Sequence, residues 1–233
     1  MKTMEQNEVQ PSNISPALNS RRNFLAKTIG GAALALGGLP LMTGKLMAVE
    51  GPCTSCDDAI TDIDILNYAL TLEHLENAFY RDGLAMFTRG NFMSAKFLRG
   101  FGGKIVNSVY PYFQLIADHE RVHVATLITV IQSLGGTPVP ELCYDFGYSN
   151  VDEFVKVAQL LENTGVMAYD GAIHLICNPD LQTAGATIAT VEARHASYLN
   201  LLNGDVPFPG AFDTPKTMAE ILAAAGGFIV ACP

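Results

Sequence analysis

The chain has 233 residues, of which 49% are hydrophobic and 16% charged, a composition that supports one main domain with a sizeable core and an appendage. Aspartate and glutamate number 23 against 14 lysines and arginines, which gives a formal net charge of -9. A chain this acidic lacks the basic surface that a phosphate backbone requires, so we exclude nucleic acid as a partner.

The first 48 residues differ in composition from the remainder and are predicted to be an export signal. Segment 20–27 reads Ser-Arg-Arg-Asn-Phe-Leu-Ala-Lys and precedes a run rich in glycine, alanine and leucine. This pattern resembles a twin-arginine signal, which implies the twin-arginine export machinery as a partner and a periplasmic or extracellular location. The apolar run from Thr28 to Met42 is shorter than the roughly 20 residues that span a bilayer. We therefore favour a signal removed near Ala48, with an uncleaved anchor as the alternative.

Five cysteines are too few to build a disulfide scaffold at this length, although an oxidising compartment permits one or two bridges. Cys53 and Cys56 form a Cys-x-x-Cys pair that could act as a metal or redox motif. No second cysteine or histidine pair follows at zinc-site spacing, so we favour a disulfide or unpaired thiols. The odd number leaves at least one cysteine without an intrachain partner, and the sequence leaves open the pairing among Cys53, Cys56, Cys143, Cys177 and Cys232.

Clusters of glycine, proline and asparagine divide the rest of the chain into four long segments with helical periodicity. The first helix is expected over about 58–88. A loop follows to Gly103, and its apolar side chains are expected to pack against the helices; these are Phe92, Phe97, Leu98 and Phe101. The second helix is expected to begin near Lys104 or Tyr110 and to end at Leu134, before a Gly-Gly-Thr-Pro stop signal.

The third helix can be capped by Ser149 or Asn150, with acidic residues in its first turn where the helix dipole favours them. It is expected to end near a Cys-Asn-Pro sequence, and the fourth helix to end at Asn203 before a glycine. In the tail, a short helix is expected with Thr214 as its cap and Pro215 as its first residue.

Strand signals are weak throughout the chain. Four long helices joined by ordinary loops predict an all-α fold, an antiparallel four-helix bundle with a short helical C-terminal tail. The predicted organisation is an export signal at 1–48, an N-terminal linker at 49–57, the bundle at 58–203 and a C-terminal extension at 204–233.

The most informative feature is an internal repeat of possible ligand residues. Each half of the bundle carries Leu-Glu, six residues and a tyrosine, and then, on the next helix, Glu-x-x-His. The first half contains Glu73, Tyr80, Glu120 and His123. The second half contains Glu162, Tyr169, Glu192 and His195.

Helix geometry explains this spacing. Residues three apart lie about 60° apart around a helix, so the glutamate and histidine of one Glu-x-x-His motif face the same neighbour and can grip one metal ion. A tyrosine seven residues on lies about 20° from its glutamate and about 10 Å along the axis. That position suits a hydrogen bond to a carboxylate of another helix.

The four glutamates lie in the middle of apolar stripes, so all four carboxylates are expected to face the core. Buried carboxylates without compensation repel one another and carry a heavy desolvation cost. Arg121 and Arg194 point away from the glutamate stripes and are poor counterions. Two divalent metal ions would supply four positive charges against four negative ones, and oxygen-rich ligation with one imidazole per ion suits iron or manganese.

This pattern resembles the ferritin-like superfamily, whose di-metal members take one glutamate from each of two helices and Glu-x-x-His from the other two. The resemblance covers about residues 60–203. It implies that Glu73 and Glu162 hold the single-glutamate positions, that Glu120 and Glu192 bridge the ions, and that His123 and His195 are terminal ligands. Segments 72–80 and 212–217 are similar to the desiccation-related branch, for which no single activity follows.

Several residues near the motifs have alternative interpretations. Glu76 lies at the edge of the stripe and could replace Glu73 as a ligand, but only Glu73 reproduces the offset to tyrosine seen in the second half. His74, His119 and His174 point away from the stripes and are expected to be surface or packing residues. Tyr80 and Tyr169 are either core aromatics or second-layer partners of the ligands.

The function that these features predict is metal-dependent redox chemistry on oxygen or peroxide, with ferroxidase, peroxidase and catalase-like activity all compatible. Two rival functions remain: a desiccation- or stress-related structural protein, and a metal-binding or storage protein without turnover. The sequence leaves the metal, the substrate and the oligomeric state open, a homo-oligomer included.

Overall fold

The computed structural model describes residues 60–232. The predicted export signal at 1–48, the linker at 49–57, Cys53 and Cys56 therefore lie outside the described residues. Within 60–232 the chain is predominantly helical, with six α-helices and two strands of two residues each. This confirms the predicted all-α bundle with a short helical tail. No helix in this part of the chain is long and apolar enough to cross a membrane.

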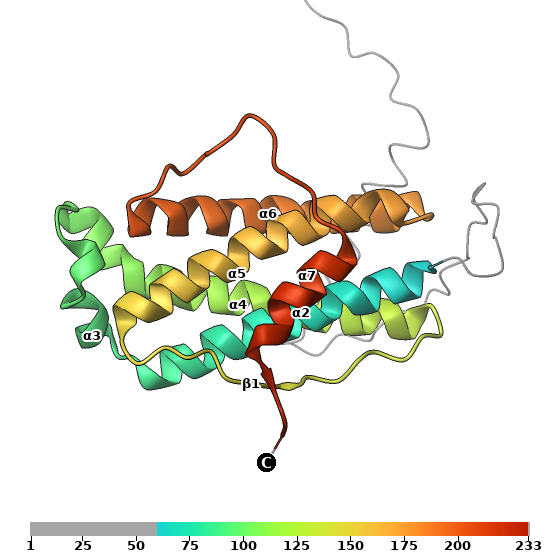
Figure 1. Ribbon diagram of the computed structural model, residues 1–233, viewed down its shortest axis with the longest axis horizontal. Coiled ribbons are helices and arrows are strands. Elements are labelled where there is room, and N and C mark those ends of the chain that lie inside the picture. The colour runs from blue at the N-terminus through green and yellow to red at the C-terminus, as the bar shows by residue number, and fades with distance from the viewer. Residues whose placement is uncertain (1–59, 233) are drawn as a thin grey trace, which may run out of the picture. The chain divides into compact units, whose positions relative to one another are not determined.

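Four long helices form the bundle: α2 (Asp62–Met86), α4 (Gly103–Ser133), α5 (Val151–Ala172) and α6 (Pro179–Asn203). α2 packs against α4, α5 packs against α6, and α2 also contacts α5. Within each of the two hairpins the helices run in opposite directions (Figure 1). The long connection 134–150 returns along the bundle, so α4 and α5 run the same way. This crossover replaces the ordinary loop that was expected there, and it is one of the connections known in four-helix bundles.

The segment between the first two long helices is more ordered than the loop expected to Gly103. It contains α3 (Arg89–Met93) and the 3₁₀ turn η1 (Lys96–Leu98). Its apolar side chains pack as predicted: Phe92 and Leu98 are buried, and Phe97 and Phe101 lie against the core.

The helix ends follow local capping chemistry. Thr61 caps α2 through a reciprocal box with Asp64, so this helix begins four residues later than the predicted start at 58. Of the two candidate caps for α5, Asn150 is the one used, and its side chain accepts a hydrogen bond from the Glu153 amide. α4 already begins at Gly103. α6 ends at Asn203, and it is capped by Gly204, whose φ of +84° suits a residue without a Cβ.

The C-terminal extension folds back over the bundle. Its helix α7 (Met218–Ala225) is capped by Thr217 in a reciprocal box with Glu220, so the predicted start with Thr214 as cap and Pro215 as first residue is wrong. The Thr-x-x-Glu box satisfies two amides at once, which the earlier Thr-Pro pair cannot do. α7 packs on α5 and lies across α2 and α5 in Figure 1.

Hydrogen bonds, a strand pair and a disulfide hold the extension in place. The Lys216 amide donates a hydrogen bond to the Met167 carbonyl of α5. Beyond α7 and the turn η3 (Gly226–Phe228), strand β2 (Ile229–Val230) pairs antiparallel with β1 (Cys143–Tyr144) of the crossover. A disulfide joins Cys143 to Cys232, 89 residues apart. Cys177 is disulfide-bonded as well. The extension and the crossover thus brace each other.

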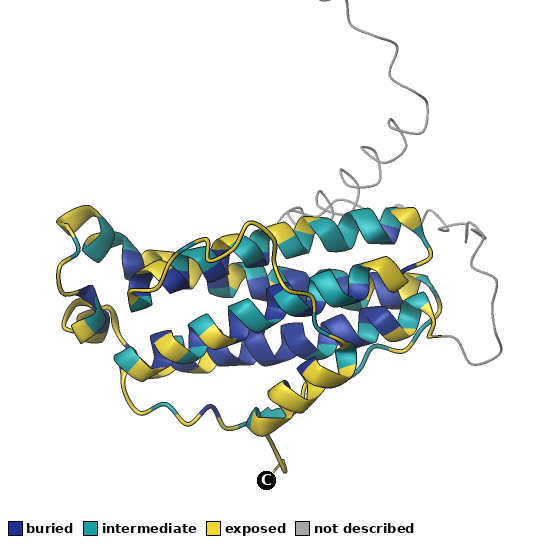
Figure 2. Ribbon diagram, turned by 45° about the horizontal axis from the view of Figure 1, so that its top comes forward, coloured by how far each residue is buried: buried dark blue, intermediate teal, exposed yellow. Residues whose placement is uncertain are grey.

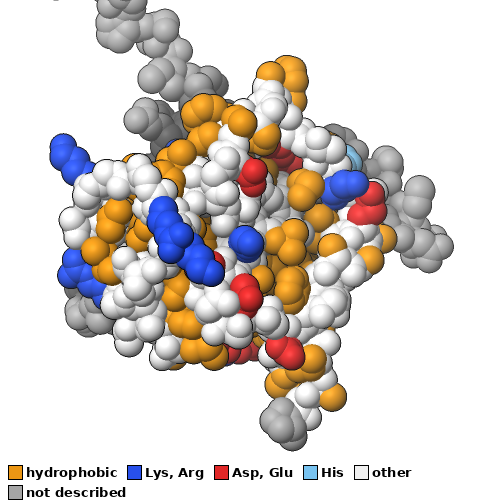
Figure 3. Space-filling view, turned by 60° about the vertical axis from the view of Figure 1, so that its left-hand side comes forward, with side chains coloured by type: hydrophobic (Ala, Val, Ile, Leu, Met, Phe, Trp, Pro, Cys, Tyr) orange, Lys and Arg blue, Asp and Glu red, His pale blue; other side chains and the backbone are white. Residues whose placement is uncertain are grey.

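Buried side chains line the inner faces of the four long helices, although α6 has none between Leu181 and Glu192 (Figure 2). Around Phe154 the core is a cluster of aromatic rings: Phe79 stacks on it at 4.6 Å between ring centroids, and Phe113 lies 5.6 Å away. The end of the molecule that carries α3 shows basic and hydrophobic side chains side by side (Figure 3). Lys96 and Arg99 share a shallow hollow there with Asp152 and Glu153, so the surface is of mixed charge.

Gly83 allows α2 to pack directly against the Phe154 ring of this aromatic cluster. A Cβ at Gly83 would lie 2.0 Å from Cε2 of the fully buried Phe154 ring. We expect Gly83→Ala to destabilise the protein by about 1–3 kcal/mol through overpacking. Gly185→Ala is the matched control, because its nearest contact would be an ordinary 3.8 Å to Ile173; alanine should leave stability unchanged or improve it there. Urea unfolding midpoints measure both effects, and a neutral Gly83→Ala would contradict the packing described.

Candidate metal centre

The six predicted ligand residues converge at the middle of the bundle, and each long helix supplies at least one. α2 provides Glu73 and α5 provides Glu162, while α4 and α6 each provide a glutamate and a histidine three residues apart. All four glutamates are 0% exposed, and the two histidines are 8% and 5% exposed. The six residues are Glu73, Glu120, His123, Glu162, Glu192 and His195.

These residues form two overlapping groups that could each hold a metal ion. The first contains Glu73, Glu120, His123 and Glu192, and the second contains Glu120, Glu162, Glu192 and His195. In each group, one possible ligand atom from every residue lies within 4.8 Å of the others. Glu120 and Glu192 belong to both groups, which is the placement that bridging carboxylates require.

The Nδ1 atoms of both histidines point at the carboxylates. His123 Nδ1 lies 3.2 Å from Glu73 Oε2, 3.1 Å from Glu120 Oε2 and 3.1 Å from Glu192 Oε1. His195 Nδ1 lies 3.1 Å from Glu162 Oε2 and 3.2 Å from Glu120 Oε1. One nitrogen of His123 thus has three carboxylate oxygens near it, and one nitrogen of His195 has two, with Glu192 Oε2 at 3.9 Å. A cation bound there could be coordinated by these oxygens.

The two tyrosines connect the halves of the repeat. Tyr80 of α2 donates a 2.6 Å hydrogen bond to Glu162 Oε1 of α5. Tyr169 of α5 donates a 2.5 Å hydrogen bond to Glu73 Oε1 of α2. Burial, followed by the charge of the accepting glutamate, raises the pKa of both phenols well above the usual range. Both hydroxyls therefore remain donors, and each single glutamate is oriented by the tyrosine of the other half.

Burial dominates the charge states of the cluster without metal. It raises the pKa of Glu120 to about 7 and that of Glu192 well above its usual range, with the charge of Glu120 adding to the shift of Glu192. Burial acts most strongly on His195 and lowers its pKa, but Glu162 and Glu120 together outweigh burial, and the pKa rises to about 10. For His123, burial likewise lowers the pKa, but Glu73, Glu120 and Glu192 together outweigh burial and raise it. The metal-free cluster therefore holds extra protons in place of other cations.

Several oxygen atoms of the cluster are left without partners. Among residues 60–232, the buried polar atoms that make no hydrogen bond include Glu120 Oε1 and both carboxylate oxygens of Glu192. Histidine nitrogens lie near them, yet not in hydrogen-bonding geometry. Buried carboxylate oxygens are costly to leave unpaired. The two glutamates common to both groups are thus the ones with unpaired carboxylate oxygens, and these oxygens could coordinate cations.

Comparison with known proteins places the bundle in a family. The sequence matches the family described as the ferritin-like domain over residues 61–205, which is more than half of the chain. The chain belongs to the ferritin-like domain family. The match begins at the cap of α2 and ends just beyond α6, so the ferritin-like domain contains all six clustered residues and leaves α7 outside it.

Individual relatives of this ferritin-like chain are distant. It is 27% identical over 179 residues to Protein rds1 of Schizosaccharomyces pombe, an alignment that covers 74% of this chain and 40% of that protein. The chain thus spans less than half the length of that relative. Among solved structures, it is similar to a conserved hypothetical protein, rv2844, from Mycobacterium tuberculosis, with 21% identity and a TM-score of 0.44, covering 65% of this chain and 96% of the other.

The neighbouring candidates of the ferritin-like domain lie outside both groups. Glu76 is buried, but it belongs to neither group, whereas Glu73 belongs to the first. His74 is buried and its Nε2 lies 3.1 Å from the Val139 carbonyl oxygen of the crossover, which makes it a packing residue. His174 is exposed on the 3₁₀ turn η2 (Ile173–Leu175). Arg121 pairs with Asp118 on the surface at 3.5 Å.

The sequence analysis missed the role of His119. Its Nδ1 lies 2.9 Å from His195 Nε2, and the two rings are stacked with 5.2 Å between centroids. It is thus the outer partner of an imidazole whose other nitrogen faces the cluster, a contact that fixes ring orientation in metal sites. In the repeat, Val191 occupies the position that matches His119, so the two halves of the cluster are not equivalent. No sequence signal identified this contact, because it joins α4 to α6 across the bundle.

Proposed function

We propose that this chain is an exported ferritin-like protein that binds a di-iron or di-manganese centre and carries out redox chemistry on oxygen or peroxide, in protection against stress. The observation that carries the proposal is that two four-residue groups share Glu120 and Glu192 at the centre of the bundle. Four carboxylates and two imidazoles match the charge and ligand preference of two divalent iron or manganese ions. In this proposal Glu73 with His123, and Glu162 with His195, are the terminal ligands.

When bound, the two ions would each supply one electron, so that oxygen and two protons give hydrogen peroxide, or hydrogen peroxide and two protons give two molecules of water. The residues of the chain orient the ligands, release protons and exclude water. Tyr80 and Tyr169 fix the two terminal glutamates, and the protons that Glu120 and Glu192 hold in the metal-free state are displaced by the cations. The apolar faces around the cluster restrict the access of water.

The deciding experiment combines elemental analysis of protein from its native compartment with measurement of oxygen and peroxide consumption. We expect about two ions per chain and turnover that is lost in Glu120→Ala, with Asp118→Asn as an exposed control on the same helix. Bound metal without turnover would instead indicate a storage or binding protein. Absence of metal would indicate a structural protein, which the likeness of segments 72–80 and 212–217 to desiccation-related proteins would then favour.

Export is the second part of the proposal. It rests on the Arg-Arg-Asn-Phe-Leu sequence at 21–25, and the disulfide between Cys143 and Cys232 supports it, because such bonds persist in oxidising compartments. Cell fractionation after replacement of both arginines by lysine tests it. Retention of the double variant inside the cell is expected, and unchanged export would contradict this route.

His119 should affect only one of the two metal positions. His119→Phe keeps the stacked ring but removes the nitrogen that faces His195. We expect this variant to lower the affinity for one of the two metal ions by about 10- to 100-fold and to leave the affinity for the other unchanged. Metal titration followed by calorimetry resolves the two steps. His174→Phe is the matched control, since that histidine is exposed on η2. Two unchanged affinities in His119→Phe would show that the stacked histidine does not support the site.

A further inference from the structure

A small cavity lies beneath α7, where the C-terminal extension crosses α2 and α5. Its volume is about 40 Å³, room for a molecule of a few non-hydrogen atoms, since one water needs about 10–15 Å³ by this measure. Its outer rim includes the exposed side chains of Leu160 and Ala224. Its inner wall includes the buried residues Leu161, Ala225 and Glu76. The cavity thus leads from the surface into the bundle.

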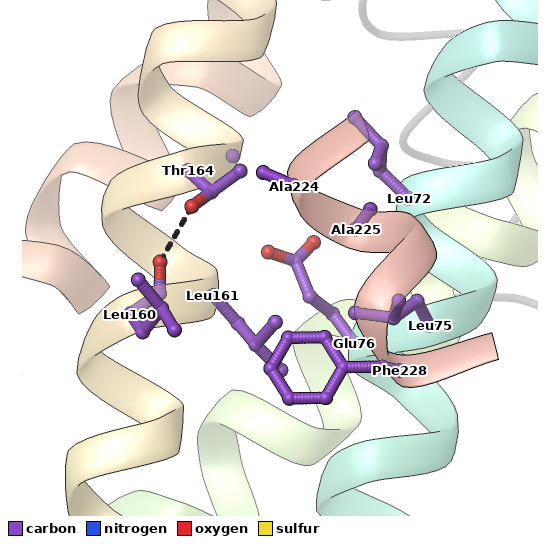
Figure 4. A pocket seen from close by; sticks show the side chains of 10 residues that line it. Leu72, Leu75, Glu76, Leu160, Leu161, Thr164, Ala224, Ala225 and Phe228 are labelled. Carbon is purple, nitrogen blue, oxygen red and sulfur yellow. Dashed lines mark hydrogen bonds between the residues drawn. The ribbon is translucent and has the colours of Figure 1, made fainter. Parts of the chain in front are cut away.

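The carboxyl group of Glu76 is the polar end of this cavity. Figure 4 shows it pointing into the space between α5 and α7, with leucine, alanine and phenylalanine side chains around it. Glu76 is only 3% exposed, yet within the described part of the chain no group donates a hydrogen bond to it. The other polar side chain of the lining, Thr164, already donates to the Leu160 carbonyl. A buried carboxyl without a partner indicates that this cavity receives a small polar or polarisable guest.

Gly165 lies where the cavity adjoins the metal-binding cluster. A Cβ at this position of α5 would lie 3.0 Å from Glu76 Oε1 and 3.5 Å from Glu192 Oε2. The carboxyl group of the cavity and a carboxyl group common to both metal-binding groups are therefore within 3.5 Å of one point. Because glycine has no side chain, nothing on α5 stands between them there. The inner end of the cavity meets the cluster at Glu192.

We propose that the cavity beneath α7 is the entry route by which a small neutral molecule, of the size and polarity of dioxygen or hydrogen peroxide, reaches the Glu192 side of the cluster. This inference rests on the proposed function and specifies its substrate class and route. The lining is almost entirely apolar, so a hydrated cation would lose too much solvation to pass. Burial, and after it the charge of Glu162, raises the pKa of Glu76 well above its usual range, which favours the uncharged form of its carboxyl group.

The test is a bulky side chain at the outer rim. Ala224→Trp would fill the mouth from an exposed position of α7, and Leu160→Trp would do so from α5. Ala223→Trp is the matched control, because Ala223 is equally exposed on α7 but does not line the cavity. Full-length protein of each type is loaded with iron or manganese, and the metal content and thermal unfolding are compared first, to show that every variant folds and binds.

Two measurements then decide. The second-order rate constants for oxidation of the reduced protein by dissolved oxygen and by hydrogen peroxide should fall about tenfold or more in the two rim variants and stay unchanged in Ala223→Trp. Xenon, which enters small apolar cavities, should be found beneath α7 in crystals of the metal-free wild-type and Ala223→Trp proteins pressurised with the gas, and not in Ala224→Trp.

Each contrary outcome has a distinct meaning. Rim variants that react as fast as the wild type would overturn the route while leaving the proposed function intact. Absence of xenon from the wild-type cavity would also overturn it. A wild type that binds no metal, or that reacts with neither oxygen nor peroxide, would refute the proposed function itself and the route with it. That failure would be visible before any variant is compared.

Discussion

Glu192→Gln should make the metal-free protein more stable and at the same time unable to retain two metal ions. Glu192 is fully buried, its carboxylate oxygens have no hydrogen-bond partner, and burial raises its pKa. Glutamine keeps the shape and removes the ionisable group. We expect a gain of about 1–3 kcal/mol in the free energy of unfolding at pH 7, because burial opposes ionisation of Glu192 in the folded chain but not in the unfolded chain, and glutamine does not carry this cost.

The gain should depend on pH, and this separates it from a packing effect. Below about pH 4.5, the carboxyl group is protonated in both the folded and unfolded chains, so Glu192→Gln should have little effect on stability there. Asp118→Asn removes the same charge from an exposed position and should change stability by less than about 0.5 kcal/mol at either pH. Denaturant unfolding at the two pH values, with metal content by elemental analysis, measures both effects. A less stable Glu192→Gln protein that still binds two ions would contradict the assignment.

The metal-free protein should lose stability as pH rises, whereas the metal-loaded protein should not. Burial raises the pKa of Glu120 from its ordinary value of 4.5 to about 7. The stabilising proton is therefore fully present below pH 4.5 and is lost as the pH rises to 7, which costs up to about 3 kcal/mol. Burial lowers the pKa of His195, but Glu162 and Glu120 together raise it to about 10, and this shift acts in the same direction between pH 6.5 and 10. Binding of the metal ions should thus stabilise the protein more at pH 8 than at pH 5.

Thermal unfolding with and without manganese at pH 5, 6.5 and 8 measures this difference. Binding should also release protons, which calorimetry in buffers of different ionisation enthalpy detects, and the apparent affinity should rise with pH. Glu120→Gln should flatten the pH profile of the metal-free protein between pH 4.5 and 7, because it removes the titrating group. A metal-free wild type equally stable at pH 5 and pH 8 would show that the cluster does not hold the protons described.

The part of the site that the sequence predicted is the part governed by helix periodicity. The repeat of Glu73 and Glu162, with Glu-x-x-His at 120–123 and 192–195, fixes which residues share a face, and an apolar stripe fixes that the face is buried. Convergence at one level of the bundle follows when four such faces meet. The seven-residue offset to Tyr80 and Tyr169 likewise depends on the helix alone, and both hydroxyls reach glutamates of the other half.

Features that depend on how separate elements meet could not be predicted in this way. The contact of His119 with His195 depends on the rotation of α4 relative to α6. The crossover 134–150, the pairing of Cys143 with Cys232 and the cavity at Glu76 depend on where distant segments lie against the bundle. The start of α7 was missed for a local reason, because the Thr217 box with Glu220 competes with an earlier Thr-Pro signal of similar strength.

The crossed phenols have a consequence for how the bundle came to be a single unit. Tyr80 donates to Glu162, and Tyr169 donates to Glu73, so each hairpin provides the hydroxyl group that orients the glutamate of the other hairpin. In an isolated hairpin, the glutamate would lack this donor and the tyrosine hydroxyl would lack this acceptor. A half-length forerunner could have completed this arrangement only by associating with a second copy of itself, and joining the two copies end to end would have made that mutual dependence permanent.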